Sequence, residues 1–211
     1  MKNKCNNLEN IKKFYETKLT EHNEDYKILA FENNKTQEIR FSVLLSGIDI
    51  SGKKILDVGC GLCNLVGFLN KKTSNYIYTG VDIVEKFIEI SRKRYPDKKI
   101  MHCDIFKNNP FKNNSFDIVI VSGAFNLRLD NNEKFIKKAL KTLFDISKKT
   151  VSINLLHPHS PDRENDKFYY YKPSEIIEYL DSELPYKISR IQLFEHYLAN
   201  DFTLICEKTK K

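Results

Sequence analysis

The sequence predicts an α/β fold built on a doubly wound, mainly parallel sheet, with a helical extension before it and an antiparallel strand near the C-terminus. From residue 54 onward, short apolar runs alternate with amphipathic segments, as strands and helices do around a parallel sheet. The last two apolar segments, 186–194 and 202–207, alternate between apolar and polar residues like two antiparallel strands. The 211 residues suffice for one domain over 1–211, with a helical cap over 1–50 and a core over 51–211.

Each element follows from a local pattern. Apolar side chains recur at helical spacing in two segments before the first strand. Pro96 ends one later helix, and Pro173 opens another at its first position. The expected helices are 8–20, 36–46, 63–71, 84–94, 131–147 and 173–181, and the expected parallel strands are 55–58, 76–82, 100–103, 116–121 and 150–156.

Composition and charge indicate a globular, cytoplasmic protein. Hydrophobic residues make up 41% and charged residues 30% of the chain, and no apolar run reaches the ~18 residues that a membrane-spanning helix needs. Residues 1–10 are polar and do not resemble a secretory signal. The net charge of +7 is spread among acidic residues, and the one tight basic cluster, 92–94, closes a helix and complements its dipole. These features argue against a membrane or nucleic-acid partner.

Five scattered cysteines do not suggest a disulfide framework. Cys60 and Cys63 form a C-x-x-C pair, a spacing found in redox and zinc sites. A structural zinc site usually needs a second pair, whereas Cys5, Cys103 and Cys206 are each isolated. We therefore predict no metal site.

The segment that indicates chemistry is the glycine turn after the first core strand. Gly59 and Gly61 allow unusual backbone angles and close approach of a ligand. Asp57 adds a carboxylate that suits a ligand with an ammonium group better than one with a pyrophosphate. The G-x-G-x-x-G fingerprint of nicotinamide dinucleotides would need glycine where this chain has Asn64.

The next two strands also end in aspartate. Asp82 can accept hydrogen bonds from both hydroxyls of a ribose, and Asp104 can accept one from an adenine amino group. Any one of these aspartates could instead cap a helix. Three at successive strand ends favour an adenosine site.

At these positions the sequence resembles the class I S-adenosylmethionine-dependent methyltransferases, which have a Rossmann-like fold. The residues that carry the resemblance are 56–61, 80–83, Asp104 and 116–122, and the likeness covers 54–156 best. Cys63 departs from the third glycine that the family often has. The resemblance implies S-adenosyl-L-methionine as cofactor and S-adenosyl-L-homocysteine as product. The cofactor-binding residues that it implies are Gln37, Arg40, Asp57, Gly59, Cys60, Gly61, Asp82, Ile83, Asp104, Ile105 and Ser122.

The flanking segments 37–41 and 122–127 and the tyrosine-rich loop resemble bacterial members associated with capsule and surface-polysaccharide modification, including O-methyl phosphoramidate decoration. That likeness implies a carbohydrate- or nucleotide-linked acceptor oxygen. It also implies that Arg40 pairs with the methionine carboxylate, assisted by Gln37; solvent exposure on a helix is the alternative for both.

Acceptor-site candidates follow the fourth and fifth strands, because those strand ends face the same edge. They are Asn126 and Arg128, then His157, and finally Tyr169 and Tyr170 in the long loop 158–172. His157 is the candidate general base because histidine titrates near neutral pH. The tyrosines would stack on an acceptor or simply cover the core. Asp201 is interpreted as a turn residue, with a position at the mouth of the site as the alternative.

Two other functions remain open. A nucleic-acid methyltransferase would often show a Pro-Pro-aromatic signature after the fourth strand, and this chain lacks it. A domain that binds the cofactor and only scaffolds partners would keep the same three aspartates.

Overall fold

The computed structural model describes residues 8–161 and 163–209. Cys5, the first residues of the predicted cap and position 162 of the long loop lie outside the described residues.

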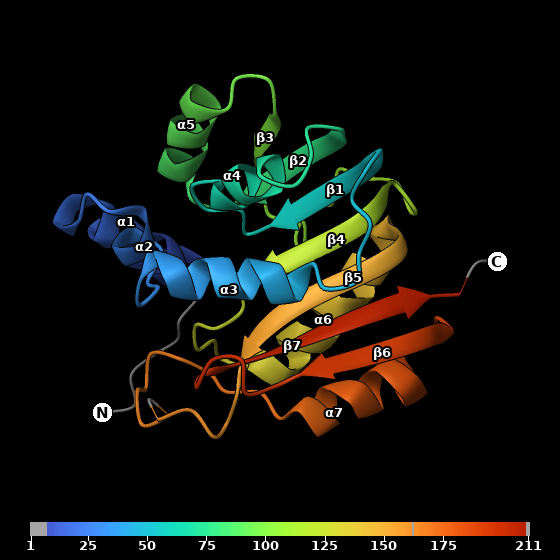
Figure 1. Ribbon diagram of the computed structural model, residues 1–211. Helices are drawn as coiled ribbons and strands as arrows, with labels where there is room; N and C mark the ends of the chain where they lie inside the picture. Colours follow the sequence, from blue (N-terminus) through green and yellow to red (C-terminus); the bar gives the residue numbers. More distant parts are fainter. Residues whose placement is uncertain (1–7, 162, 210–211) are drawn as a thin grey trace.

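Seven strands form one sheet in the order β3-β2-β1-β4-β5-β7-β6 (Figure 1). Strands β1 to β5 pair in parallel, whereas β7 runs antiparallel to both β5 and β6. This arrangement confirms the predicted doubly wound, mainly parallel sheet with an antiparallel strand near the C-terminus. The strands are β1 (Lys53–Val58), β2 (Tyr76–Asp82), β3 (Lys99–His102), β4 (Phe116–Ser122), β5 (Ser147–Leu156), β6 (Ile188–Phe194) and β7 (Asp201–Lys208).

The helices begin and end within a few residues of the predicted positions. The sequence pattern missed one short helix, α2, and did not foresee that α7 continues into a π-helical turn over Tyr179–Glu183. None of the helices in the described part of the chain is long and apolar enough to cross a bilayer. The helices are α1 (Leu8–Glu21), α2 (Asp25–Ile28), α3 (Asn34–Leu44), α4 (Asn64–Asn70), α5 (Glu85–Arg94), α6 (Asn132–Ile146) and α7 (Pro173–Glu178).

Two apolar cores cover the two faces of the sheet. Successive side chains of a strand point to opposite faces, so Ile55 packs with α3 and α4 while Leu56 packs with α6 and α7. Figure 1 shows α3 in front of the sheet and α6 behind it. Both faces of the sheet are covered, so β4 is buried at most of its positions. Most of its residues are accordingly apolar.

The N-terminal helices α1 and α2 lie beyond the carboxyl ends of β1 and β4 (Figure 1). Tyr15 and Leu19 of α1 pack against a small cluster that includes Leu62 and Phe87. The cap therefore borders the edge at which parallel sheets of this type bind ligands.

Candidate active site

The glycine turn after β1 is hydrogen-bonded to β2 and lies close to the loop after β4. The backbone N–H groups of Gly59 and Cys60 both donate to the carbonyl of Val81, at 2.8 and 3.1 Å. Gly59 and Gly61 have φ angles of +71° and +54°, which residues with side chains rarely adopt. A Cβ atom at Gly59 would lie 2.3 Å from Ala124 Cβ. The turn therefore needs glycine at position 59 for space as well as for its backbone angle.

Asp82, at the end of β2, ties this turn to the start of α5. The backbone N–H of Gly61 donates to Asp82 Oδ2 at 2.8 Å, and that of Val84 donates to Oδ1 at 2.9 Å. Burial raises the pKa of Asp82, and the backbone hydrogen bonds act in the opposite direction. Each carboxylate oxygen has a further lone pair. Asp82 can thus shape the turn and accept hydroxyl groups of a ligand at the same time.

Asp57 is a buried carboxyl on the neighbouring strand. The Tyr78 hydroxyl donates to Asp57 Oδ2 at 2.8 Å. Burial raises the pKa of Asp57 to about 7, the Tyr78 hydrogen bond opposes this shift, and the charge of Asp82 adds to it. A cationic ligand group beside Asp57 would favour the ionised carboxylate.

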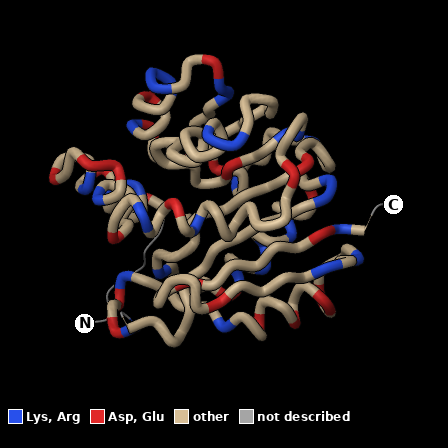
Figure 2. Tube along the Cα trace, in the orientation of Figure 1, with Lys and Arg blue, Asp and Glu red and all other residues tan. Residues whose placement is uncertain are grey.

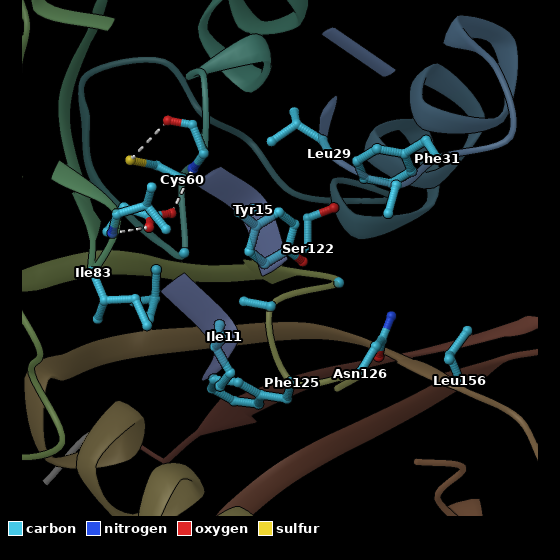
Figure 3. Close-up of a pocket in the computed structure, with 18 of the residues that line it drawn as sticks. Ile11, Tyr15, Leu29, Phe31, Cys60, Ile83, Ser122, Phe125, Asn126 and Leu156 are labelled. Carbon is cyan, nitrogen blue, oxygen red and sulfur yellow. Dashed lines mark hydrogen bonds between the residues drawn. The ribbon is translucent and has the colours of Figure 1, made fainter. Parts of the chain in front are cut away.

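A cavity of about 1190 Å³ opens at the carboxyl ends of the central strands (Figure 3). Its walls come from the ends of β1 to β4, from α1 and from the segment between α2 and α3. Every residue that the sequence predicted to bind the cofactor lines this cavity: Gln37, Arg40, Asp57, Gly59, Cys60, Gly61, Asp82, Ile83, Asp104, Ile105 and Ser122.

Helix α3 delivers two of these residues to the cavity. It begins at a capping box, in which the backbone N–H of Thr36 donates to Asn33 Oδ1 at 2.9 Å. Gln37 and Arg40 are buried on its inner side, and Asn64 donates to Gln37 Oε1 at 3.0 Å. The alternative that these polar side chains are simply exposed to solvent is therefore wrong.

Arg40 forms a buried ion pair that the sequence did not indicate. Its Nε and Nη2 atoms lie 3.1 and 2.5 Å from Asp201 Oδ2. Its guanidinium also stacks over the ring of Phe31, 4.5 Å from the centroid. Asp201 lines the cavity, so the interpretation of this residue as a plain turn residue needs correction. The only sequence signal was the position of Asp201 directly before the apolar residues of the last strand.

His157, the candidate general base, lies next to Leu156, which lines the cavity. His157 itself is absent from the described cavity lining. The backbone N–H of His159 donates to His157 Nδ1 at 3.0 Å, and Nε2 contacts Glu195 Oε1 at 2.9 Å. Because Nδ1 accepts, Nε2 carries the proton and donates to Glu195. These contacts fix the end of β5 to the loop before β7, and the catalytic role of His157 stays a prediction.

The other acceptor-site candidates divide into two groups. Asn126 and Tyr170 line the cavity as expected. Arg128 and Tyr169 lie outside the described lining; Arg128 Nε donates to the carbonyl of Asp166 at 3.0 Å, and its guanidinium lies 5.6 Å from the Tyr169 ring centroid. The last pair therefore stabilises the loop instead of facing a ligand.

The sequence analysis assigned no role in the site to α1, although it predicted the helix. Ile11 and Tyr15 point into the cavity (Figure 3). Tyr15 meets Phe87 edge-to-face, with ring centroids 5.6 Å apart. Burial raises the pKa of Tyr15 far above its usual range, with the charge of Asp82 adding to the shift. The amphipathic pattern revealed the helix, but which element its apolar side would cover depends on tertiary packing.

A second group that sequence reasoning missed is a cluster of phenylalanines on the cavity wall. Phe106, Phe125 and Phe135 form three edge-to-face pairs with centroid distances of 5.2–5.5 Å. They come from three different segments, so no local pattern joins them. They give this part of the cavity an apolar, aromatic surface.

Cys60 and Cys63 are buried free thiols within the glycine turn. Over residues 8–161 and 163–209, no group of three or more histidine, cysteine or acidic side chains is arranged to hold a metal ion.

Charged residues of both signs are interspersed along the chain trace (Figure 2). Several lysines pair with acidic neighbours, as Lys137 does with Glu183 at 2.8 Å and Lys141 with Asp145 at 2.9 Å. The net charge of +7 is therefore not gathered into a stripe in this view.

Comparisons with known proteins agree with this site. Residues 55–148 match a family model described as a methyltransferase domain. The chain is 26% identical over 145 residues to a demethylmenaquinone methyltransferase of Thermotoga maritima, covering 69% of this chain and 61% of that protein. It is 36% identical over 75 residues to a phthiotriol/phenolphthiotriol dimycocerosates methyltransferase of Mycobacterium leprae, covering 35% and 27%. The chain thus spans less than two thirds of the length of these curated relatives.

The fold is similar to that of the magnesium protoporphyrin IX methyltransferase of Synechocystis PCC 6803, solved with bound S-adenosylhomocysteine. The TM-score is 0.63 at 15% identity, covering 88% of this chain and 85% of the other. The matched segment contains the glycine turn, the ends of β2 and β3, and β4. Residues 55–148 are therefore similar to a methyltransferase domain, and the seven-stranded sheet around them is similar in fold to a solved methyltransferase.

Proposed function

We propose that this protein transfers a methyl group from S-adenosylmethionine to an oxygen atom of a small organic acceptor. The observation that carries the proposal is one cavity that joins a glycine turn to aspartates at the ends of β1, β2 and β3. A dinucleotide-binding site is disfavoured, because the buried carboxyl of Asp57 lies beside the turn that would have to receive the pyrophosphate.

The residues of the cavity fit this cofactor. Asp82 retains lone pairs for the ribose hydroxyls while holding the turn. Ile83 and Ile105 offer apolar walls next to Asp82 and Asp104, which suits a flat adenine ring with an amino edge. The turn has no room for a Cβ at Gly59 and leaves only 2.7 Å between a Cβ at Gly61 and Leu29 Cδ2. A backbone without side chains lets a ligand approach closely.

When bound, S-adenosylmethionine supplies a methyl carbon that its sulfonium has already activated. The main task of the chain is therefore to bind and align, a contribution worth several kcal/mol. Asp82 would hold the ribose of the cofactor, and Asp57 would hold the ammonium group of its amino-acid end. Arg40 uses Nε and Nη2 for Asp201, which leaves Nη1, close to Gly123, for the carboxylate of that end. Tyr15 and Ile11 of α1 cover the cavity and exclude water from it.

The acceptor that we propose is a small molecule with apolar surface. The three phenylalanines favour such a body, and the relatives named above carry the names of quinone, lipid and porphyrin methyltransferases. Tyr170 on the same lining could stack on a sugar ring. This supports keeping a carbohydrate-linked acceptor, which the sequence resemblance implies, as the second candidate.

The proposal is tested by calorimetric titration of the protein with S-adenosylhomocysteine and, separately, with NAD. We expect micromolar or tighter binding of the first and no measurable binding of the second, because the turn and Asp57 disfavour a pyrophosphate. Binding of NAD alone, or of neither compound, would contradict the assignment. The protein is then incubated with S-adenosylmethionine and a panel of phenols, quinols and glycosides. Formation of S-adenosylhomocysteine identifies an enzyme, and its absence across the panel favours a scaffold.

Affinity for S-adenosylhomocysteine is expected to increase as the pH rises through about 7, the value to which burial raises the pKa of Asp57. Below that pH the carboxyl is neutral and does not attract the ammonium group of the ligand. The ionised fraction falls tenfold per pH unit below the pKa, so we expect affinity to rise up to about tenfold between pH 6 and pH 8. Asp57→Asn keeps an acceptor for Tyr78 and should flatten this dependence. An equally steep profile in the variant would assign the titration to another group.

A further inference from the structure

A buried tyrosine on β2 reaches the carboxyl of Asp57 on the neighbouring strand. In the pairing of β1 with β2, Tyr78 lies opposite Ile55 and Gly80 lies opposite Asp57. These residues share one face of the sheet, because every second residue of a strand points to the same side. The Tyr78 hydroxyl donates to Asp57 Oδ2 at 2.8 Å, and the two residues are only 2% and 3% exposed.

Gly80 leaves room for the tyrosine ring beside Asp57. A Cβ atom at position 80 would lie 3.0 Å from the Tyr78 hydroxyl, 3.1 Å from Cε1 of its ring and 3.0 Å from Cys60 Sγ. These distances are shorter than ordinary van der Waals contact, so a side chain at this position would displace the ring or the thiol. The hydrogen bond to Asp57 therefore depends on a glycine at position 80.

The hydrogen bond occupies one oxygen of Asp57 and leaves the other for a ligand. Within residues 8–161 and 163–209, Oδ1 of Asp57 accepts no hydrogen bond. This oxygen is not one of the four enclosed side-chain atoms that lack a partner in that part of the chain, so it keeps accessible surface. Asp57 lines the cavity. Tyr78 thus fixes the orientation of a carboxyl whose second oxygen is available to a donor bound there.

The same hydrogen bond favours the charged form of the carboxyl. Burial raises the pKa of Asp57 to about 7, and the hydroxyl of Tyr78 opposes this rise. Burial and the charge of Asp57 raise the pKa of Tyr78 well above its usual value, so the hydroxyl keeps its proton and remains a donor. Apart from Tyr78, the titratable groups beside Asp57 are Asp82, Cys60 and Cys63.

We propose that Tyr78 is a positioning residue for the cofactor, which orients Asp57 and keeps it charged so that the carboxylate can receive the ammonium group of S-adenosylmethionine. This inference rests on the proposed function and deepens it. Tyr78 is absent from the described cavity lining, so it acts through Asp57 and not by touching the ligand. The adenosine end of the cofactor, which is assigned to Asp82 and the apolar walls, does not depend on this tyrosine.

The Tyr78→Phe variant tests the proposal with two ligands that differ in the amino-acid end. At pH 7 we expect it to bind S-adenosylhomocysteine about fivefold more weakly than the wild-type protein does. Its affinity for 5′-methylthioadenosine, which has no ammonium group, should change less than about twofold. Calorimetric titration measures both dissociation constants.

The pH profile separates this role from a merely structural one. Loss of a donor to the charged form raises the pKa of a carboxyl, so the pH at which S-adenosylhomocysteine affinity rises should move up by about one unit. From a starting pKa of about 7, that shift lowers the ionised fraction about fivefold at pH 7 and less than about twofold at pH 8.5. The variant should therefore approach wild-type affinity at pH 8.5, whereas a distorted site would stay weak at both pH values.

Tyr76→Phe is the matched control. Tyr76 is buried on the same strand and the same face of the sheet, but its hydroxyl donates to Asn70 Oδ1 at 2.6 Å. This variant loses an equivalent hydroxyl away from Asp57. It should keep the wild-type affinity for S-adenosylhomocysteine and the wild-type pH profile.

A double variant shows whether Tyr78 acts through Asp57. In an Asp57→Asn background, Tyr78→Phe should change S-adenosylhomocysteine affinity less than about twofold, because the charge that it supports is already gone. A full loss in that background would mean that Tyr78 acts through another group, such as Cys63, and the proposal would be wrong. Equal weakening of both ligands, or an unshifted pH profile in folded Tyr78→Phe, would also overturn it. Failure of the wild-type protein to bind S-adenosylhomocysteine would reject the proposed function, and this inference with it.

Discussion

Replacing Asp82 by alanine is expected to weaken S-adenosylhomocysteine binding at least about 100-fold. The carboxylate would accept charge-assisted hydrogen bonds from the ribose hydroxyls, each worth about 1.5–3 kcal/mol. The same substitution frees the backbone N–H groups of Gly61 and Val84, which Asp82 now binds at 2.8 and 2.9 Å. The variant therefore loses ligand contacts and the anchor of the turn together. Calorimetric titration measures the loss.

A second substitution separates these two effects. Asp82→Asn keeps an oxygen for one of the two backbone donors and should retain more of the turn while losing the charge. We expect its affinity to fall by about tenfold. Glu85→Ala is the control, because that carboxylate lies three residues further along, is exposed and is absent from the described cavity lining. Wild-type affinity in a folded Asp82→Ala variant would show that Asp82 does not contact the cofactor.

Gly59→Ala is expected to abolish measurable cofactor binding and to lower the free energy of unfolding. The added Cβ would meet Ala124 Cβ at 2.3 Å, well inside van der Waals contact, so the turn or the loop after β4 must move. The φ angle of +71° adds a cost of about 1–2 kcal/mol for any L side chain. Overpacking of this kind typically costs a further 1–3 kcal/mol or so. Urea denaturation and calorimetry measure the two effects.

Gly47→Ala provides the matched control for the steric term. Gly47 has a φ of +68°, but a Cβ there would have no atom within 4 Å. It should cost only the backbone term of about 1–2 kcal/mol and leave cofactor affinity unchanged. Equal destabilisation by the two substitutions would mean that the contact with Ala124 is relieved without cost.

The central part of the fold could be predicted because its signals are local. Each parallel strand and its following helix show their own periodicity, and parallel strands bring their carboxyl ends to one edge. Asp57, Asp82 and Asp104 each lie within two residues of the end of a strand, so their meeting at one cavity followed from that rule. Gln37 and Arg40 came from the family resemblance, and the structure places both on the lining.

The prediction for His157 rested on a strand end, which does not reveal where a side chain is directed. Being next to the end of β5 placed the residue near the correct edge, but its side chain is oriented by Glu195, 38 residues later. Arg128, which follows β4, contacts Asp166 and Tyr169 of the long loop after β5. Edge position follows from the backbone, whereas the direction of a side chain depends on the partners that tertiary packing offers.

The sequence by itself determined the order of strands and helices, the glycine turn and the acidic strand ends, because these depend on residues close together in the chain. Only the tertiary structure decided that Arg40 would pair with Asp201, 161 residues away. It also decided that Tyr15 of the cap would lie against Phe87 over the same space. Such contacts join segments with no shared local pattern, and their geometry is set by how the helices and the last hairpin pack around the sheet.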